Sequence, residues 1–291
     1  MNGVWTPEDI ELRGVHGLSE VHRHRDGELA RTFLTSDKTL LEDAVTSVAL
    51  GKNLLLRGPT GSGKTRLAES LAARFGLSIE AINCSVDLDA EALLGFKTLD
   101  VADGKNAIRY VEGPVVRAMQ SGSMLYIDEI NMARPETLPI LNSLLDYRRQ
   151  LTNPFTAQTI SAHPNFRVIA AINEGYVGTM PMNEALKNRF VIVDVPYLQG
   201  DVLARLIRGH TEGLAEQAVD WFVGLSADLV AAARSGQLSE EAASIRALLD
   251  ACDLAVYIPP LRAIARAIAA KLDDERERAV VMNLANTYFP A

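Results

Sequence analysis

The feature that most constrains this 291-residue sequence is a glycine-rich stretch that reads GPTGSGKT and fits the pattern G-x-x-x-x-G-K-[ST]. It follows residues 53–57, a short apolar run that predicts a strand, and it opens residues 65–75, which predict a helix. Glycines let such a loop fold tightly, so that backbone N–H groups converge on anionic oxygens beside the positive end of the helix. The stretch therefore predicts a phosphate-binding loop made of Gly58, Pro59, Thr60, Gly61, Ser62, Gly63, Lys64 and Thr65.

Two side chains of this loop have separate expected roles. Lys64 supplies a positive charge to the β- and γ-phosphates of a nucleoside triphosphate, and the Thr65 hydroxyl is expected to ligate Mg²⁺. The loop recognises phosphates and not the base, so the sequence leaves ATP and GTP open, and we take ATP as the expected nucleotide.

A second motif strengthens this interpretation. Residues 124–127 form an apolar strand that ends in Asp128 and Glu129. In open α/β sheets, ligands bind at the carboxyl ends of the strands, so both carboxylates are expected beside the phosphate loop. Asp128 is predicted to hold Mg²⁺, and Glu129 to orient and deprotonate the attacking water. Together the two motifs predict a Mg²⁺-dependent ATPase that converts ATP and water to ADP and phosphate.

The rest of the pattern predicts an α/β fold with a helical addition. A helix is expected between Ser36 and Gly51, and further short apolar strands are expected at 78–83, 123–127, 167–172 and 190–195. Such alternation favours a mostly parallel, five-stranded sheet flanked by helices. After Pro196 the sequence predicts only helices, at about 200–210, 214–234, 240–256, 259–272 and 275–286. We therefore divide the chain into an N-terminal segment (1–35), an α/β nucleotide-binding domain (36–197) and an all-α lid domain (198–291).

Composition excludes several classes of protein. The formal net charge of −8 argues against sequence-independent binding of nucleic acid. The two cysteines, Cys84 and Cys252, lie far apart and predict neither a disulfide framework nor a zinc site. His22 and His24 are expected to be surface residues and not metal ligands. No run approaches the roughly 20 apolar residues of a membrane helix, and no signal peptide is visible, so we expect a cytoplasmic protein without membrane insertion.

Three further polar residues lie at places that suit nucleotide chemistry. Asn173 ends the fourth predicted strand, where its amide can reach the attacking water or the γ-phosphate. Arg189 precedes the fifth strand, which suits a neighbouring subunit's nucleotide better than its own, as an arginine finger does. Arg246 opens a lid helix and can fold back onto the phosphates. The plainer alternatives are a loop-capping asparagine, a surface ion pair and an ordinary helix arginine.

These motifs together resemble an AAA+ ATPase of the MoxR type, in the dynein-related and midasin-like branch. The resemblance spans about residues 36 to 285 and assigns Asn173 as first sensor, Arg189 as finger and Arg246 as second sensor. Residues 146–150 (DYRRQ) are most similar to the subgroup with the CbbQ, NorQ and GvpN proteins. The sequence departs from the family where Glu174 follows the sensor asparagine, a position that often holds proline, and where Ser-Ile-Arg replaces the commoner Ser-Pro-Arg or Ser-Thr-Arg.

The resemblance implies an oligomeric state and a cellular function. It implies a homo-oligomeric ring, usually a hexamer, that acts as a chaperone on a protein client, often a metalloenzyme, with a partner that carries a von Willebrand factor A domain. The client-contacting segments would be an insertion at about 86–113 and a hairpin at about 151–165. Arg148 and Arg149 are expected at the surface, as an exposed charge pair or at a subunit interface.

Other functions remain open at this point. A nucleic-acid motor or loader uses the same core, and Lys97, Lys105 and Arg109 on the insertion could contact phosphates. A nucleotide-gated binding module with negligible turnover is a second alternative, against which Glu129 and Arg189 both argue. A small-molecule kinase fits worst, because no acceptor-binding element is visible.

Overall fold

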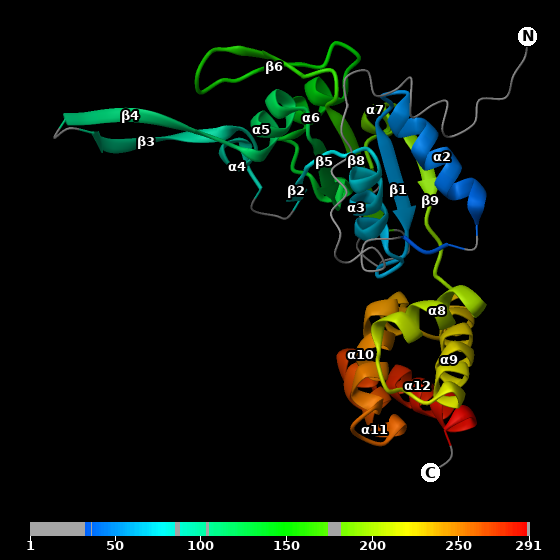
Figure 1. Ribbon diagram of the computed structural model, residues 1–291. Helices are drawn as coiled ribbons and strands as arrows, with labels where there is room; N and C mark the ends of the chain where they lie inside the picture. Colours follow the sequence, from blue (N-terminus) through cyan, green and yellow to red (C-terminus); the bar gives the residue numbers. More distant parts are fainter. Residues whose placement is uncertain (1–32, 36, 85–87, 103–104, 174–181, 290–291) are drawn as a thin grey trace, which may run out of the picture.

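The computed structural model describes residues 33–35, 37–84, 88–102, 105–173 and 182–289. An α/β part comes first along the chain and an all-helical part follows it, and in Figure 1 the two lie one above the other. Residues 1–32, which hold His22 and His24, and residues 174–181, which hold Glu174, lie outside the described residues.

The α/β part is built on a five-stranded parallel sheet with the strand order β2-β5-β8-β1-β9. Apolar residues dominate the central strands because helices cover both faces of the sheet. All five strands predicted from the sequence are present: β1 (Leu54–Gly58), β2 (Ile79–Asn83), β5 (Met124–Asp128), β8 (Arg167–Asn173) and β9 (Val191–Asp194).

Side chains alternate between the two faces along each strand, and each face has its own set of helices. Leu54 and Leu56 pack with α2 (Lys38–Ala49) and α3 (Lys64–Arg74) in one core cluster. Leu55, which points the other way, belongs to a second cluster. That second cluster includes residues of α4 (Ala90–Leu94), α5 (Pro114–Ser121), α6 (Leu138–Leu145) and α7 (Glu184–Lys187).

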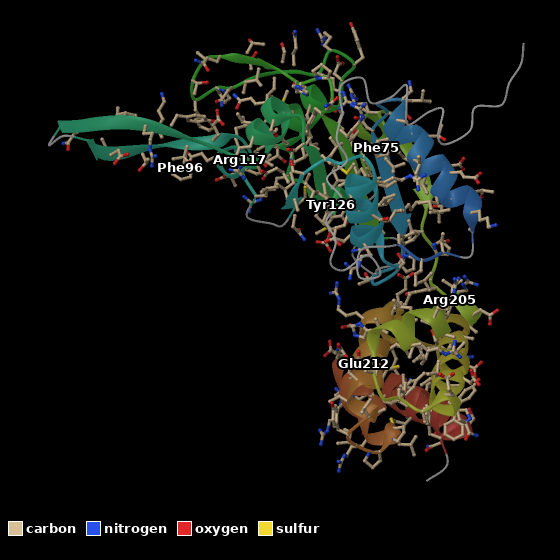
Figure 2. The ribbon with its side chains drawn as sticks, in the orientation of Figure 1. Phe75, Phe96, Arg117, Tyr126, Arg205 and Glu212 are labelled. Carbon is tan, nitrogen blue, oxygen red and sulfur yellow. The ribbon has the colours of Figure 1, made fainter. Side chains whose placement is uncertain are left out.

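Both expected insertions are hairpins. Strands β3 (Gly95–Ala102) and β4 (Lys105–Glu112) form a long antiparallel ribbon that projects from the α/β part (Figure 1). Figure 2 shows Phe96 on this ribbon, well away from Tyr126 in the sheet. The second hairpin pairs β6 (Gln150–Thr152) with β7 (Thr159–Ser161). Tyr110 joins the two, because its hydroxyl donates to the Leu94 carbonyl and accepts from Asn153 Nδ2 at 2.6 Å.

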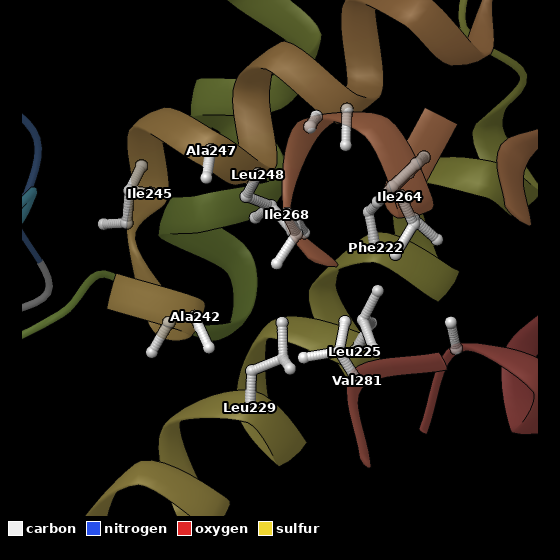
Figure 3. Packing of buried hydrophobic residues seen from close by; sticks show 14 of the residues in the cluster. Phe222, Leu225, Leu229, Ala242, Ile245, Ala247, Leu248, Ile264, Ile268 and Val281 are labelled. Carbon is white, nitrogen blue, oxygen red and sulfur yellow. The ribbon is translucent and has the colours of Figure 1, made fainter. Parts of the chain in front are cut away.

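The helical part has a separate core (Figure 3), in which Phe222, Leu225, Leu248 and Val281 are buried together. Its helices are α8 (Gly200–His210), α9 (Glu216–Arg234), α10 (Ile245–Ala255), α11 (Pro260–Ala267) and α12 (Glu275–Tyr288). In the part of the chain that the structure describes, no helix is both long and apolar enough to cross a membrane.

The structure corrects two of the predicted lid helices. The helix expected at 240–256 is divided, because Ser244 has an extended backbone between the 3₁₀ turn η2 (Glu240–Ala243) and α10. The helix expected at 259–272 ends at Ala267 and continues as the 3₁₀ turn η3 (Ala269–Lys271). Apolar periodicity runs across such short breaks, so the pattern alone reads each pair as one helix.

The expectation of an exposed charge pair is wrong for Arg149, which is partly buried. Its Nη2 donates to the Gly51 carbonyl at 2.8 Å, just past the end of α2, and its guanidinium lies 5.6 Å from the centre of the Phe166 ring. Burial lowers the pKa of this guanidinium from its usual value. Arg148 is exposed as expected, and it forms an ion pair with Asp146 at 3.0 Å. Arg149 is thus a structural residue, in which a cation stabilises a helix C-terminus.

Candidate nucleotide-binding site

The phosphate loop connects β1 to α3 and depends on its glycines. Gly61 and Gly63 have φ angles of 78° and 94°, in the left-handed region that other residues rarely adopt. At Gly58, an added Cβ would lie 2.2 Å from the Val195 carbonyl oxygen. The backbone itself therefore requires glycine at three positions of the predicted motif.

Lys64 and Ser62 give the loop its chemistry. The buried Lys64 ammonium donates to the carbonyls of Gly58 and Pro59, at 2.9 and 2.8 Å. Burial lowers the pKa of Lys64 to about 8, and the charge of Asp128 opposes that shift. The Ser62 hydroxyl is buried and has no hydrogen-bond partner among the described residues. A buried cation beside an unsatisfied hydroxyl fits an anionic group in this loop.

The carboxylates lie at the carboxyl edge of β5, as expected. The Asp128 side chain accepts from the Glu129 backbone N–H at 3.0 Å, and Glu129 has a left-handed backbone with a φ of 52°. Tyr126 links this edge to the phosphate loop, because its hydroxyl lies 3.1 Å from Thr65 Oγ1 and also interacts with Asp128. A hydroxyl and a carboxylate are the hard oxygen donors that Mg²⁺ prefers, so Thr65 and Asp128 fit that ion.

Tyr126 is a site residue that sequence reasoning missed. It stands two residues before Asp128, and side chains two apart on a strand share a face. That alternation was the available signal. Burial raises the pKa of Tyr126 well above its usual value, so the hydroxyl stays protonated as a neutral bridge.

Asn173 reaches the second carboxylate from the neighbouring strand. Its Nδ2 donates to Glu129 Oε1 at 3.2 Å, across the β5–β8 pair. An amide that holds one carboxylate oxygen fixes the direction of the other, which suits a base that must face one water molecule. The structure therefore brings the proposed base and the proposed first sensor together.

The helical part contacts the phosphate loop. An added Cβ on Gly61 would lie 2.6 Å from Ser244 Oγ, so the start of α10 touches the loop directly. The exposed Arg246 follows Ser244 by two residues, in the first turn of α10. Tyr197, which packs against the helical core, donates its hydroxyl to the Glu240 carbonyl at 3.1 Å. Arg246 thus lies two residues from Ser244, which touches the loop, although no hydrogen bond or ion pair joins Arg246 to the loop among the described residues.

Arg189 lies at the opposite edge of the sheet. It precedes β9, whose first residue Val191 pairs with Leu54 at the start of β1, whereas the phosphate loop begins at Gly58, where β1 ends. The length of β1, roughly 16 Å at about 3.3 Å per residue, separates the two. The Arg189 guanidinium donates to the Ala185 carbonyl and is partly exposed. The structure therefore does not bring Arg189 to the phosphate loop of its own chain.

Comparison with known sequences identifies the fold family. The family model of the AAA domain (dynein-related subfamily) matches residues 53–190. The uncharacterized protein YojN of Bacillus subtilis (strain 168) is 59% identical over 257 residues, which are 88% of this chain and 84% of that protein. An uncharacterized protein of Staphylococcus aureus (strain USA300) is 54% identical over 258 residues, which are 88% of this chain and 98% of that protein.

Solved structures share the fold at low sequence identity. NtrX from Brucella abortus has a TM-score of 0.52 and 19% identity, over 79% of this chain and 53% of that one. A RuvB mutant from Thermotoga maritima has a TM-score of 0.50 and 18% identity, over 84% of this chain and 73% of that one. One NtrX structure was solved in complex with ADP. These likenesses show a parallel α/β core with a helical region after it.

Proposed function

This chain belongs to the dynein-related subfamily of AAA-domain ATPases, and from that membership we propose that it is a ring-forming, Mg²⁺-dependent ATPase of the MoxR type that remodels a protein client. One observation carries the proposal. Lys64, Glu129 and Asn173 lie at one edge of the sheet, whereas the arginine proposed to complete the site lies at the other.

Hydrolysis follows from the residues at the carboxyl edge. The phosphate loop and Lys64 would hold the β- and γ-phosphates of ATP, and Thr65 and Asp128 would hold Mg²⁺, which would supply positive charge against the phosphates. Glu129 accepts a proton from the attacking water, and the amide of Asn173 keeps its carboxylate in position.

The place of Arg189 argues for a ring. A site completed by a neighbour's residue requires each subunit to present its far edge to the next subunit, and such head-to-tail contacts form a ring where the rotation between subunits closes. We propose a homo-hexamer in which Arg189 acts as a finger in trans. The finger stabilises transition-state charge, so an isolated subunit turns over slowly.

The lid converts nucleotide state into movement. We propose that residues 36–197 and 198–291 are separate domains, and that Arg246 contacts the γ-phosphate from the lid as the second sensor. Because Ser244 already touches the loop at Gly61, loss of the phosphate would alter the angle between the domains.

The two hairpins are the proposed client-contacting elements. Leu99 and Ile108 pair across the long ribbon, and their side chains are 75% and 72% exposed. An exposed apolar pair of this kind suits contact with a protein. We propose that the protein is cytoplasmic, that its client is a metalloenzyme, that it works with a von Willebrand factor A-domain partner, and that ATP is the nucleotide.

The experiment compares two kinds of effector. The ATPase rate is measured alone, with single- and double-stranded DNA or RNA, and with the proteins encoded beside the gene, at several salt concentrations. Stimulation by a neighbouring protein supports a client-remodelling ATPase. Stimulation by nucleic acid that falls steeply with salt would replace it with the motor or loader function.

A further inference from the structure

We propose that Asn53, which sequence reasoning left without a role, is the positioning residue for the Arg189 finger; this inference rests on the proposed trans-acting ring. Asn53 immediately precedes β1 and is buried, with 6% of its surface exposed. Its Nδ2 donates to the Arg189 carbonyl at 3.0 Å and to the Leu145 carbonyl at 2.9 Å.

The backbone of Asn53 also forms a hydrogen bond with the segment that carries Arg189. The Asn53 carbonyl accepts from the Val191 backbone N–H at 2.8 Å, so side chain and backbone together hold both sides of Phe190. The contact at Leu145 ties this clamp to the end of α6, next to the loop that carries Asp146. Arg148 is the main cause of the lowered pKa of Asp146, and the positive charge of Arg189 contributes less. The Asn53 contacts therefore lie beside the charged groups at this edge of the sheet.

The details of the Asn53 amide argue for positioning and against ordinary core packing. Its Oδ1 is buried and has no hydrogen-bond partner among the described residues. A buried amide that leaves one polar atom unsatisfied is a poor choice for stability alone, and its two donated bonds both go to the segments around the finger. Because buried polar groups have few acceptable arrangements, the amide restricts where the Arg189 backbone can lie.

Strand β1 also joins this clamp to the nucleotide site. The ladder with β9 runs from Leu54 opposite Val191 to Arg57 opposite Asp194, and β1 then enters the phosphate loop at Gly58. In each subunit, the segment that follows the finger is thus hydrogen-bonded to the strand that leads into that subunit's own phosphate loop. A finger displaced by about 1 Å is expected to lose roughly a hundredfold in rate, which makes its anchor a sensitive point.

The test separates finger donor from finger acceptor by mixing two subunits. Acceptor subunits carry Arg189→Ala and keep their own Glu129. Donor subunits carry Glu129→Gln and keep their own finger. Each mutant alone hydrolyses ATP at a strongly reduced rate, and mixed rings regain activity where a donor finger meets an acceptor site. Asn53→Ala is then introduced into the donor or into the acceptor, and the regained kcat is measured, with light scattering to confirm that rings form.

The inference predicts an asymmetric result. Asn53→Ala in the donor lowers the regained kcat roughly ten- to hundredfold, whereas the same change in the acceptor, whose finger is already absent, leaves it unchanged. Asn53→Leu, which keeps the branched shape of the side chain and removes the unsatisfied oxygen, replaces Asn53→Ala if the smaller side chain prevents folding.

The other outcomes overturn the inference in distinguishable ways. Equal regained activity with and without Asn53→Ala in the donor rejects the role of Asn53 and leaves the trans finger standing. Equal loss from donor and acceptor makes Asn53 a general folding residue. If the unmodified donor fails to activate the acceptor at all, the proposed ring mechanism is itself wrong.

Discussion

Glu129, the proposed general base, also has a strained backbone conformation. A non-glycine residue in the left-handed region costs about 1–3 kcal/mol and persists only where its surroundings enforce it. The hydrogen bonds from the Glu129 backbone to Asp128 and from Asn173 to the Glu129 carboxylate provide that enforcement. In this conformation the carboxylate accepts a hydrogen bond from Asn173.

Glu129→Gln tests the proposed base directly. Glutamine keeps the size of the side chain and cannot accept a proton, so we expect kcat to fall by about 10²–10⁴-fold while ATP still binds. Steady-state ATPase assays and nucleotide-binding titrations measure the two effects. The exposed Glu136→Gln is the matched control, and an unchanged kcat in Glu129→Gln would remove the base from the mechanism.

Asn173→Ala tests the partner of that base. Without the amide the Glu129 carboxylate rotates freely, so we expect kcat to fall roughly tenfold with little change in ATP affinity. Asn283→Ala, an exposed asparagine on α12, serves as the control. If Asn173→Ala weakens ATP binding and leaves kcat alone, the residue contacts nucleotide in the ground state and does not orient the base.

At the scale of elements, Tyr110 ties the long hairpin to the short one. Tyr110→Phe leaves the Asn153 amide and the Leu94 carbonyl without this partner, so the free energy of unfolding should fall by about 1–3 kcal/mol. Denaturant unfolding monitored by circular dichroism measures the change. The same substitution at Tyr257, which is 87% exposed, should be close to neutral. Equal effects at the two positions would contradict the proposed link.

The lid core can be probed through a buried thiol. Burial raises the pKa of Cys252 to about 12, so at pH 8 only about one molecule in 10⁴ carries the reactive thiolate. We expect iodoacetamide at pH 8 to leave Cys252 unmodified in the native protein and to alkylate it fully in urea, as mass spectrometry would show. Rapid alkylation of the native protein would mean that the helical part opens under native conditions.

The sequence predicted the sheet well because its strands are short apolar runs with clear boundaries. The phosphate loop was equally visible, since backbone geometry restricts three of its positions to glycine. The break at Ser244 was missed because the spacing of apolar residues stays helical across a single residue with an extended backbone. Tyr126 and Asn53 were missed for another reason: each acts through a partner on a distant segment, which only the fold brings near.

In the whole molecule, the two ends of the parallel sheet carry different groups. The carboxyl edge holds the nucleotide site and faces the lid, and the amino edge holds Arg189 and its clamp at Asn53. A subunit built in this way has its candidate nucleotide site and its proposed finger on opposite sides, so in the proposed ring each site is completed by assembly. Activity should therefore depend on how many subunits are joined.

The most direct measurement is the ATPase rate per subunit as a function of protein concentration, with mass determined by light scattering, for the wild type and Arg189→Ala. We expect specific activity to rise as the wild type assembles, and Arg189→Ala to assemble normally with kcat lowered by about 10³-fold or more. A monomer that hydrolyses ATP at the full rate, with Arg189→Ala equally active, would contradict the ring mechanism and leave only the nucleotide site.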